Sequence, residues 1–173
     1  MDINILYFLN GLTSKSVFLD SLFIFLASYL QYFLGIIFLL FLFFSGYKHK
    51  EKIKIFAVTV GSIIVSRLFI VELIRFFYHR PRPIILYNLN QLIPETGYSF
   101  PSGHSTIFFA ASAAIFCYNK KLGVIFFVAS VLMNISRVIV GVHYLSDIIG
   151  GMILGSIVAF SLFYLIEKKY KNV

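Results

Sequence analysis

Residues 21–47 read SLFIFLASYLQYFLGIIFLLFLFFSGY and contain no charged side chain. About 20 apolar residues in a helix cross the roughly 30 Å hydrocarbon core of a bilayer, so this stretch suits one transmembrane helix and is too short for two. The whole chain has the same character, since 60% of its 173 residues are hydrophobic and 13% are charged. Soluble domains carry about 25% charged residues. The sequence therefore predicts an integral membrane protein that forms one domain, residues 1–173.

Four further apolar segments follow this stretch, at residues 55–77, 102–118, 122–140 and 144–166. Residues 2–12 mix apolar and polar positions at helical spacing, which predicts a short helix lying in the membrane interface. The expected fold class is therefore all-α: a polytopic transmembrane helical bundle of about five spans plus an N-terminal interfacial helix. Small residues at Gly150, Gly151 and Gly155 predict close helix packing of the last span.

The lysines predict the orientation of the bundle, because cytoplasmic loops are enriched in basic residues. They follow the first, third and fifth spans: Lys48, Lys50, Lys52 and Lys54; Lys120 and Lys121; Lys168, Lys169 and Lys171. Five spans place all three groups on one side, which we expect to be the cytoplasm, with the protein in a bacterial inner (plasma) membrane. Because the basic residues lie between apolar runs, the net charge of +8 indicates membrane topology and an anionic substrate, and no nucleic-acid partner.

Three polar segments then gather at the outer face, contributed by residues 75–83 (RFFYHRPRP), 101–104 (PSGH) and 136–147 (SRVIVGVHYLSD). Arginine forks bind phosphate oxygens in pairs, which favours Arg75, Arg82 and Arg137 as ligands of an anion. A helix that begins near Ser102 and Gly103 offers free backbone N–H groups. The serine hydroxyl is a further donor, and the glycine lets the backbone approach a ligand closely. These residues predict a phosphate-binding site.

Two histidines in these segments suit phosphoryl transfer. His143 and Asp147 are four residues apart, so on a helix the carboxylate orients one ring nitrogen and leaves the other free as a nucleophile. His104, from another helix, can protonate the departing oxygen. No cluster of carboxylates or cysteines offers a metal site, and the arginines repel a cation. The sequence therefore predicts chemistry without a metal or cofactor.

The order and spacing of these motifs resemble the type-2 phosphatidic-acid phosphatase superfamily. The resemblance covers about residues 67–160 and includes lipid phosphate phosphatases, undecaprenyl-pyrophosphate phosphatases, lipid A phosphatases and vanadium haloperoxidases. It implies a helical core, a covalent phosphohistidine at His143, His104 as the general acid, Asp147 as the orienting acid, and Arg82 and Arg137 as phosphate ligands. The chain departs from the family at Arg75, where a lysine is usual.

The expected activity is metal-independent dephosphorylation of a lipid phosphate or pyrophosphate at the outer membrane face. The short chain and the His79–Pro83 string resemble small bacterial members that act on undecaprenyl pyrophosphate. Lipid A 1-phosphate, phosphatidylglycerol phosphate and phosphatidic acid remain alternatives. So do a lipid phosphotransferase and a non-catalytic protein that binds or flips lipid phosphates. The sequence leaves the oligomeric state open.

Four ionisable residues have simpler interpretations. Arg67 and Glu72 lie inside the second span, where charges are costly and usually paired, so we expect a structural ion pair. Arg80, like His79, is expected to line the mouth of the site rather than to bind the substrate.

Overall fold

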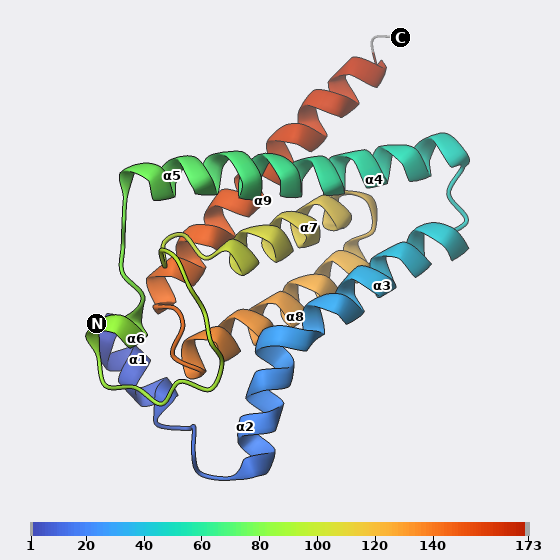
Figure 1. The fold of residues 1–173 in the computed structure, drawn as a ribbon. Helices are drawn as coiled ribbons and strands as arrows, with labels where there is room; N and C mark the ends of the chain where they lie inside the picture. Colours follow the sequence, from blue (N-terminus) through green and yellow to red (C-terminus); the bar gives the residue numbers. More distant parts are fainter. Residues whose placement is uncertain (1, 172–173) are drawn as a thin grey trace.

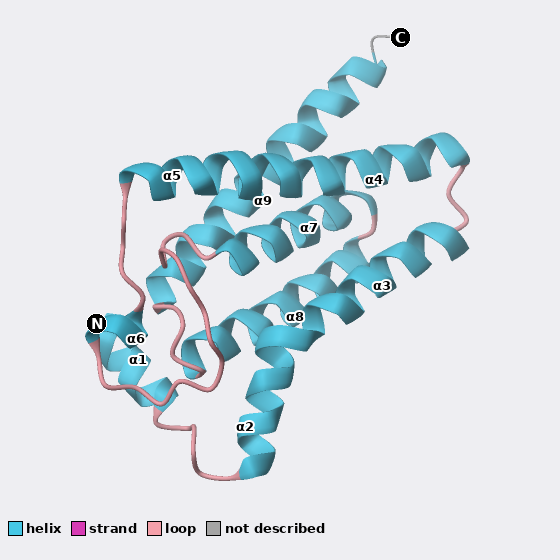
Figure 2. Ribbon diagram, viewed as in Figure 1, coloured by secondary structure: helices cyan, strands magenta, loops and turns pink. Residues whose placement is uncertain are grey.

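The computed structural model describes the backbone of residues 2–171 and the side chains of residues 2–168. In this part of the chain all regular elements are helices (Figure 2), which confirms the predicted all-α bundle. In chain order they are α1 (Asp2–Asn10), α2 (Val17–Ile24), η1 (Phe25–Tyr29), α3 (Leu30–Phe44), α4 (His49–Ile63), η2 (Ile64–Ile70), α5 (Val71–Phe77), α6 (Pro83–Leu86), α7 (Gly103–Tyr118), α8 (Lys120–Ile139) and α9 (Leu145–Lys171). The two segments η1 and η2 are π-helical turns within longer helices.

The first predicted span is one continuous helix, α2–η1–α3, which runs from Val17 to Phe44. It begins where the Ser16 side chain accepts a hydrogen bond from the backbone N–H of Leu19 at 3.2 Å, a normal N-cap. The helix bends between α2 and α3 (Figure 1), where the wide turns of η1 interrupt the regular α-helical ladder. The second span, α4–η2–α5, begins at His49, six residues before the prediction, because the lysine-rich segment is also helical.

Five apolar helices connect the two ends of the bundle (Figure 1), as the sequence predicts. Four of them are long and apolar enough to cross a bilayer alone. The fifth, α7, has 16 residues and spans about 24 Å at 1.5 Å per residue. More than half of its residues are buried, and it packs against α4, α8 and α9. The helix that opens with the PSGH segment is therefore the interior helix of the bundle.

The predicted close packing of the last span is confirmed by the contact between α9 and α7. A Cβ atom at Gly155 would lie 2.4 Å from the carbonyl oxygen of Thr106, and one at Gly151 would lie 2.7 Å from that of Ser102. At the start of α9, the carbonyl of Asp147 accepts a hydrogen bond from the N–H of Ser102 at 3.1 Å. These contacts fix the first turns of α7 and α9 beside each other.

The lysine-bearing connections lie together at one end of the bundle. The Tyr47 hydroxyl donates to the carbonyl of Tyr118 at 2.9 Å, which joins the α3–α4 and α7–α8 connections. Lys54 pairs with Glu167 near the end of α9 at 2.8 Å. The side chains of Lys169 and Lys171 lie outside the described residues.

The opposite end carries α1, α6 and the loop of residues 78–101 (Figure 1). Leu6 of α1 is buried in a cluster with Val138, Tyr144 and Ile148. The Asn10 side chain donates to the carbonyls of Ile139 and Asn90 at 2.8 and 3.0 Å. The N-terminal helix is thus a packed part of this end of the bundle, while its predicted place in the membrane interface stays a prediction.

Candidate active site

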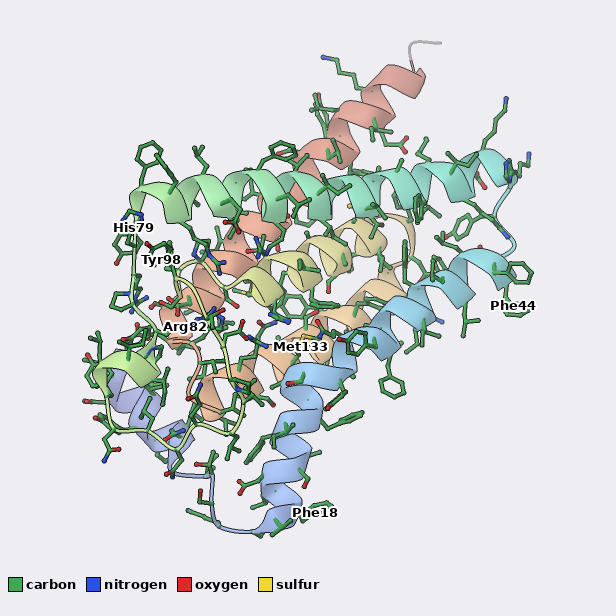
Figure 3. The ribbon with its side chains drawn as sticks, in the orientation of Figure 1. Phe18, Phe44, His79, Arg82, Tyr98 and Met133 are labelled. Carbon is green, nitrogen blue, oxygen red and sulfur yellow. The ribbon has the colours of Figure 1, made fainter. Side chains whose placement is uncertain are left out.

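A cavity of about 250 Å³ lies at this end of the bundle, under the loop of residues 78–101. It brings together six of the eight residues that the sequence predicts for the site. Its lining residues are Arg67, Arg75, Arg82, Glu95, Thr96, Gly103, His104, Ile107, Arg137 and His143. Arg82 lies among the loop segments and the first turns of α7 and α9 (Figure 3). Of the other two predicted residues, Asp147 pairs with His143 and Ser102 is not among the residues that line the cavity.

His143 lies in the short turn between α8 and α9. Gly141 has a positive φ of 83°, a backbone conformation that a side chain disfavours, and the turn brings His143 to the cavity that Arg137 also lines. Because α9 begins at Leu145, His143 precedes the helix instead of sharing a helical face with Asp147, as the sequence analysis expected. The pairing is nevertheless formed: Asp147 Oδ2 lies 3.2 Å from His143 Nδ1 and accepts from the N–H of Tyr144 at 2.9 Å.

The imidazole of His143 is 1% exposed. Burial, together with the positive charges of Arg137 and Arg82, holds the pKa of His143 well below its ordinary value. The ring is therefore neutral at physiological pH, and the Asp147 carboxylate favours the tautomer in which Nδ1 carries the proton. Nε2 then carries no proton, and its lone pair faces the nearby guanidinium of Arg82 at the cavity.

Arg82 is held in one orientation by three carbonyls from two backbone segments. Its guanidinium donates to the carbonyls of Thr96, Gly97 and Val142 at 2.9 to 3.1 Å, and one of its nitrogens lies 3.3 Å from His143 Nε2. Burial lowers the pKa of Arg82 to about 10, so it still carries its charge at neutral pH. A fixed cation beside Nε2 favours the binding of an anionic group at this position.

Buried Arg137 and half-buried Glu95 form an ion pair that the sequence does not predict. Arg137 is 2% exposed. It donates to the carbonyl of Ala27 at 3.1 Å and to the carboxylate of Glu95. The second oxygen of that carboxylate lies 3.6 Å from Arg82. Burial opposes the charge on Glu95, but Arg137 and Arg82 outweigh it and lower the pKa of Glu95. The carboxylate of Glu95 therefore contacts two of the arginines that the sequence predicts as phosphate ligands.

Two guanidinium nitrogens at the cavity have no partner. The Nε atoms of Arg75 and Arg137 are both buried and make no hydrogen bond among the described residues, although Arg75 also donates to the carbonyl of Pro101 at 3.1 Å. Buried donors are normally satisfied, so a pair of orphaned donors at one cavity calls for a ligand. An oxyanion would supply the missing acceptors.

The sequence matches the family model of the PAP2 superfamily over residues 56–171. The chain belongs to the PAP2 superfamily. It is 31% identical over 164 residues to undecaprenyl-diphosphatase BcrC of Bacillus subtilis, an alignment that covers 94% of this chain and 83% of that one.

Among solved structures, that of LpxE from Aquifex aeolicus matches with a TM-score of 0.77 and 25% identity, covering 94% of both chains. A PAP2-type phosphatidylglycerolphosphate phosphatase from Bacillus subtilis matches with a TM-score of 0.66 and 24% identity, covering 96% of this chain and 85% of that one. The latter likeness shows the fold alone. The protein is a PAP2-type lipid phosphate or pyrophosphate phosphatase in a bacterial membrane.

In this PAP2 phosphatase, Arg80 contacts the His143–Asp147 pair through the carboxylate of Asp147. Its guanidinium donates to Asp147 Oδ1 at 2.7 Å and to Asp2 of α1 at 2.9 Å, and it lies 3.9 Å over the Tyr144 ring. Partial burial opposes its charge, but Asp147 and Asp2 raise the pKa of Arg80. Arg80 does not line the cavity, so its expected place at the mouth is wrong. His79 also stays off the cavity and packs against the Tyr98 ring, 4.6 Å between centroids (Figure 3).

The PSGH segment of the PAP2 phosphatase contributes through its glycine and histidine. Ser102 is fully buried and its hydroxyl accepts from the N–H of Ser105 at 3.4 Å, so it caps α7 instead of facing the cavity, contrary to its predicted role. Gly103 does line the cavity, but Arg67 fills the space of its missing side chain: a Cβ there would lie 2.6 Å from Arg67 Nε. Arg67 also forms the predicted ion pair with Glu72.

A second cavity of about 340 Å³ adjoins the first in the PAP2 phosphatase. Both are lined by Glu95, His104 and Arg137, and Gln31 and Ser28 of the first span line the second one. His104 thus stands between the two cavities. Within the described residues, no three histidines, cysteines or carboxylates are grouped as a metal site would require.

Proposed function

We propose that the protein removes the terminal phosphate of a lipid pyrophosphate, with undecaprenyl pyrophosphate as its preferred substrate, through a phosphohistidine on His143. The reaction takes place at the outer face of the bacterial inner membrane and requires no metal. The observation that carries the proposal is the position of His143. Its Nδ1 is held by Asp147, and its Nε2 opens on a cavity lined by four arginines.

In the first step, His143 Nε2 attacks the terminal phosphorus while the bond from phosphorus to the bridging oxygen breaks. Arg75, Arg82 and Arg137 bind the three outer oxygens, whose charge grows in the transition state. His104, which borders both cavities, gives its proton to the bridging oxygen as the lipid monophosphate leaves. Asp147 stabilises the charge that develops on the imidazole of His143.

In the second step, water replaces the leaving group and attacks the phosphohistidine. His104, now neutral, accepts the proton of that water, which returns it to its starting state. The bond from phosphorus to Nε2 breaks, and His143 recovers its lone pair as inorganic phosphate departs. The balance is one lipid pyrophosphate and one water consumed, and one lipid monophosphate and one phosphate formed.

Similarity to the Bacillus subtilis undecaprenyl-diphosphatase, along 94% of this chain, supports the choice of substrate. The orientation is supported by the lysine-bearing connections, which lie at the end opposite to the cavity. Cytoplasmic ends of membrane proteins are the ones enriched in lysine. The cavity then opens at the outer face.

Phosphate release from purified protein with a panel of lipids tests the reaction and the substrate. We expect a higher kcat/KM for undecaprenyl pyrophosphate than for lipid A 1-phosphate, phosphatidylglycerol phosphate or phosphatidic acid. Release should be unchanged by EDTA, because arginines supply the charge that a metal would otherwise provide. Loss of activity in EDTA, restored by a divalent cation, would contradict the mechanism. Transfer of phosphate to an added lipid acceptor instead of water would identify a phosphotransferase.

Cysteine labelling tests the membrane face. In a variant whose native Cys117 is replaced by serine, an impermeant thiol reagent added to intact cells should label His79→Cys. It should not label Lys50→Cys or Lys121→Cys, which are expected to react only after the cells are opened. Labelling of the two lysine positions from opposite sides would overturn the topology, and labelling of both in intact cells would reverse it.

A further inference from the structure

We infer that Arg67 binds the second, lipid-proximal phosphate of a pyrophosphate substrate and makes the site prefer lipid pyrophosphates to lipid monophosphates. This inference rests on the proposed function. It adds a specificity-determining residue that lies outside the motif positions. The inference starts from the position of Arg67, which lines the same cavity as the three arginines that bind the terminal phosphate in the proposed mechanism.

Arg67 reaches the cavity from the membrane side. Its backbone precedes that of Arg75 by eight residues along the second span, which corresponds to about 12 Å of helix. Its guanidinium extends back to the start of α7, and the oxygen of Glu72 that pairs with it also lies 3.7 Å from Arg75. The two guanidinium groups are therefore neighbours, with Arg67 entering from the side of the bilayer. Ile107 of α7, whose side chain is the apolar one among the described lining residues, also lines the cavity. A lipid tail that leaves the cavity toward the bilayer therefore passes Arg67.

The chemistry of the reaction puts the second phosphate in that direction. In phosphoryl transfer the nucleophile and the leaving oxygen lie on opposite sides of the phosphorus, roughly in line. His143 attacks from the outer end, so the bridging oxygen and the group behind it point away from His143 and toward the membrane. In a pyrophosphate substrate that group is a phosphate, and it carries charge that needs a cation. In a monophosphate it is an uncharged alcohol.

The local structure holds Arg67 ready for this role. It lies within the π-helical segment η2, and such segments often re-aim side chains at functional sites. The absence of a side chain at Gly103 lets its guanidinium lie against the start of α7. Its partner Glu72 is 52% exposed and does not line the cavity, so the ion pair leaves part of the guanidinium facing inward.

The neighbouring cavity is the competing place for the second phosphate. Its polar side chains Ser28 and Gln31 are uncharged, and Arg137 is the cation among its described lining residues. That arginine already binds the terminal phosphate in the proposed mechanism, and it is 2% exposed and tied to Glu95 and to the carbonyl of Ala27. Arg67 is also paired, but its partner Glu72 is exposed and lies outside the cavity. Arg67 therefore offers the better electrostatic match to a second phosphate.

The ratio of kcat/KM for undecaprenyl pyrophosphate to that for undecaprenyl phosphate tests the inference. R67Q should lower this ratio by about 10- to 100-fold, the range expected for one charge-assisted hydrogen bond. R67K, which keeps the charge and loses the fork, should fall between R67Q and the wild type. E72Q is the control for the ion pair. Glu72 also lies 3.7 Å from Arg75, which binds the terminal phosphate of either lipid, so E72Q is expected to change kcat/KM for both lipids alike and to leave their ratio unchanged.

Three results would overturn the inference. One is an unchanged ratio in R67Q. Another is an equal fall of the ratio in E72Q, which would make the role of Arg67 purely structural. The third is a ratio kept in R67Q and lost in Gln31→Leu, which would place the second phosphate in the neighbouring cavity. If R67Q does not fold, an unchanged ratio in R67K overturns it. If the wild type hydrolyses neither lipid, the proposed function fails instead.

Discussion

Replacing His143 by glutamine is expected to lower phosphate release by about 10⁴-fold or more, the order of loss seen when a covalent nucleophile is removed. Glutamine keeps a polar side chain that still reaches Arg82 and Asp147, but its amide cannot form the phosphoenzyme. Because His143 is 1% exposed and contacts both residues, the conservative change also limits the damage to the fold. Phosphate release from undecaprenyl pyrophosphate measures the effect.

A trapped intermediate gives a second readout for the same prediction. Lipid labelled in its terminal phosphate should leave an acid-labile, base-stable label on the wild type and none on H143Q. His104→Gln is expected to slow both formation and hydrolysis of the intermediate, because it removes the proton donor of the first step and the acceptor of the second. His79→Gln is the matched control, since His79 packs against Tyr98 away from the cavity. Label on H143Q would exclude His143 as the nucleophile.

The sequence predicts the helices well because their lengths follow from the lengths of apolar runs. It also identifies the residues that meet at the cavity, since Arg75, Arg82, His104, Arg137 and His143 all stand at helix ends that five crossings bring to one side. The helix ends themselves are less predictable. His143 pairs with Asp147 through a turn and a capping contact, although the same four-residue spacing suggests a shared helical face.

Residues that act through irregular segments or distant contacts escape the sequence. Glu95 lies in a loop without periodicity, and the available signal is that it is the sole acidic residue between positions 78 and 101. Asp2 reaches Arg80 and Ser146 from the other end of the chain, and no spacing rule relates them. Ser102 shows the opposite error: a serine before a helix is as well suited to capping as to binding a ligand, and here capping prevails.

Replacing Arg137 by methionine is expected to lower kcat/KM by about 10²- to 10³-fold, the usual loss for one group that stabilises charge in the transition state. The substituted side chain fills the space but provides neither the unpartnered Nε nor the pair with Glu95. Two effects then add to each other. The substrate loses a ligand, and the freed carboxylate of Glu95 is left with Arg82 as its cation. Phosphate release, with thermal unfolding in detergent to verify the fold, measures the outcome.

The effect of the freed Glu95 carboxylate shows whether Glu95 competes with the substrate or assists turnover. If its carboxylate competes with the substrate phosphate for the arginines, removing its charge must help. Glu95→Gln alone should then strengthen inhibition by inorganic phosphate. Added to Arg137→Met, it should restore activity by about 10-fold, the value of one charged hydrogen bond returned to Arg82. Glu51→Gln, at the far end of the bundle, is the control and should have neither effect.

The opposite result in the double variant would contradict competition between Glu95 and the substrate. A further fall in activity when Glu95→Gln joins Arg137→Met would mean that the carboxylate assists turnover, for instance by holding Arg82 in place. The wild-type geometry argues for competition, because Glu95 binds Arg137 directly and lies 3.6 Å from Arg82, where the phosphate oxygens belong. A carboxylate there offsets part of the charge of two buried cations before the substrate binds. It also weakens the hold on the phosphate product, which has to leave before the next lipid can bind.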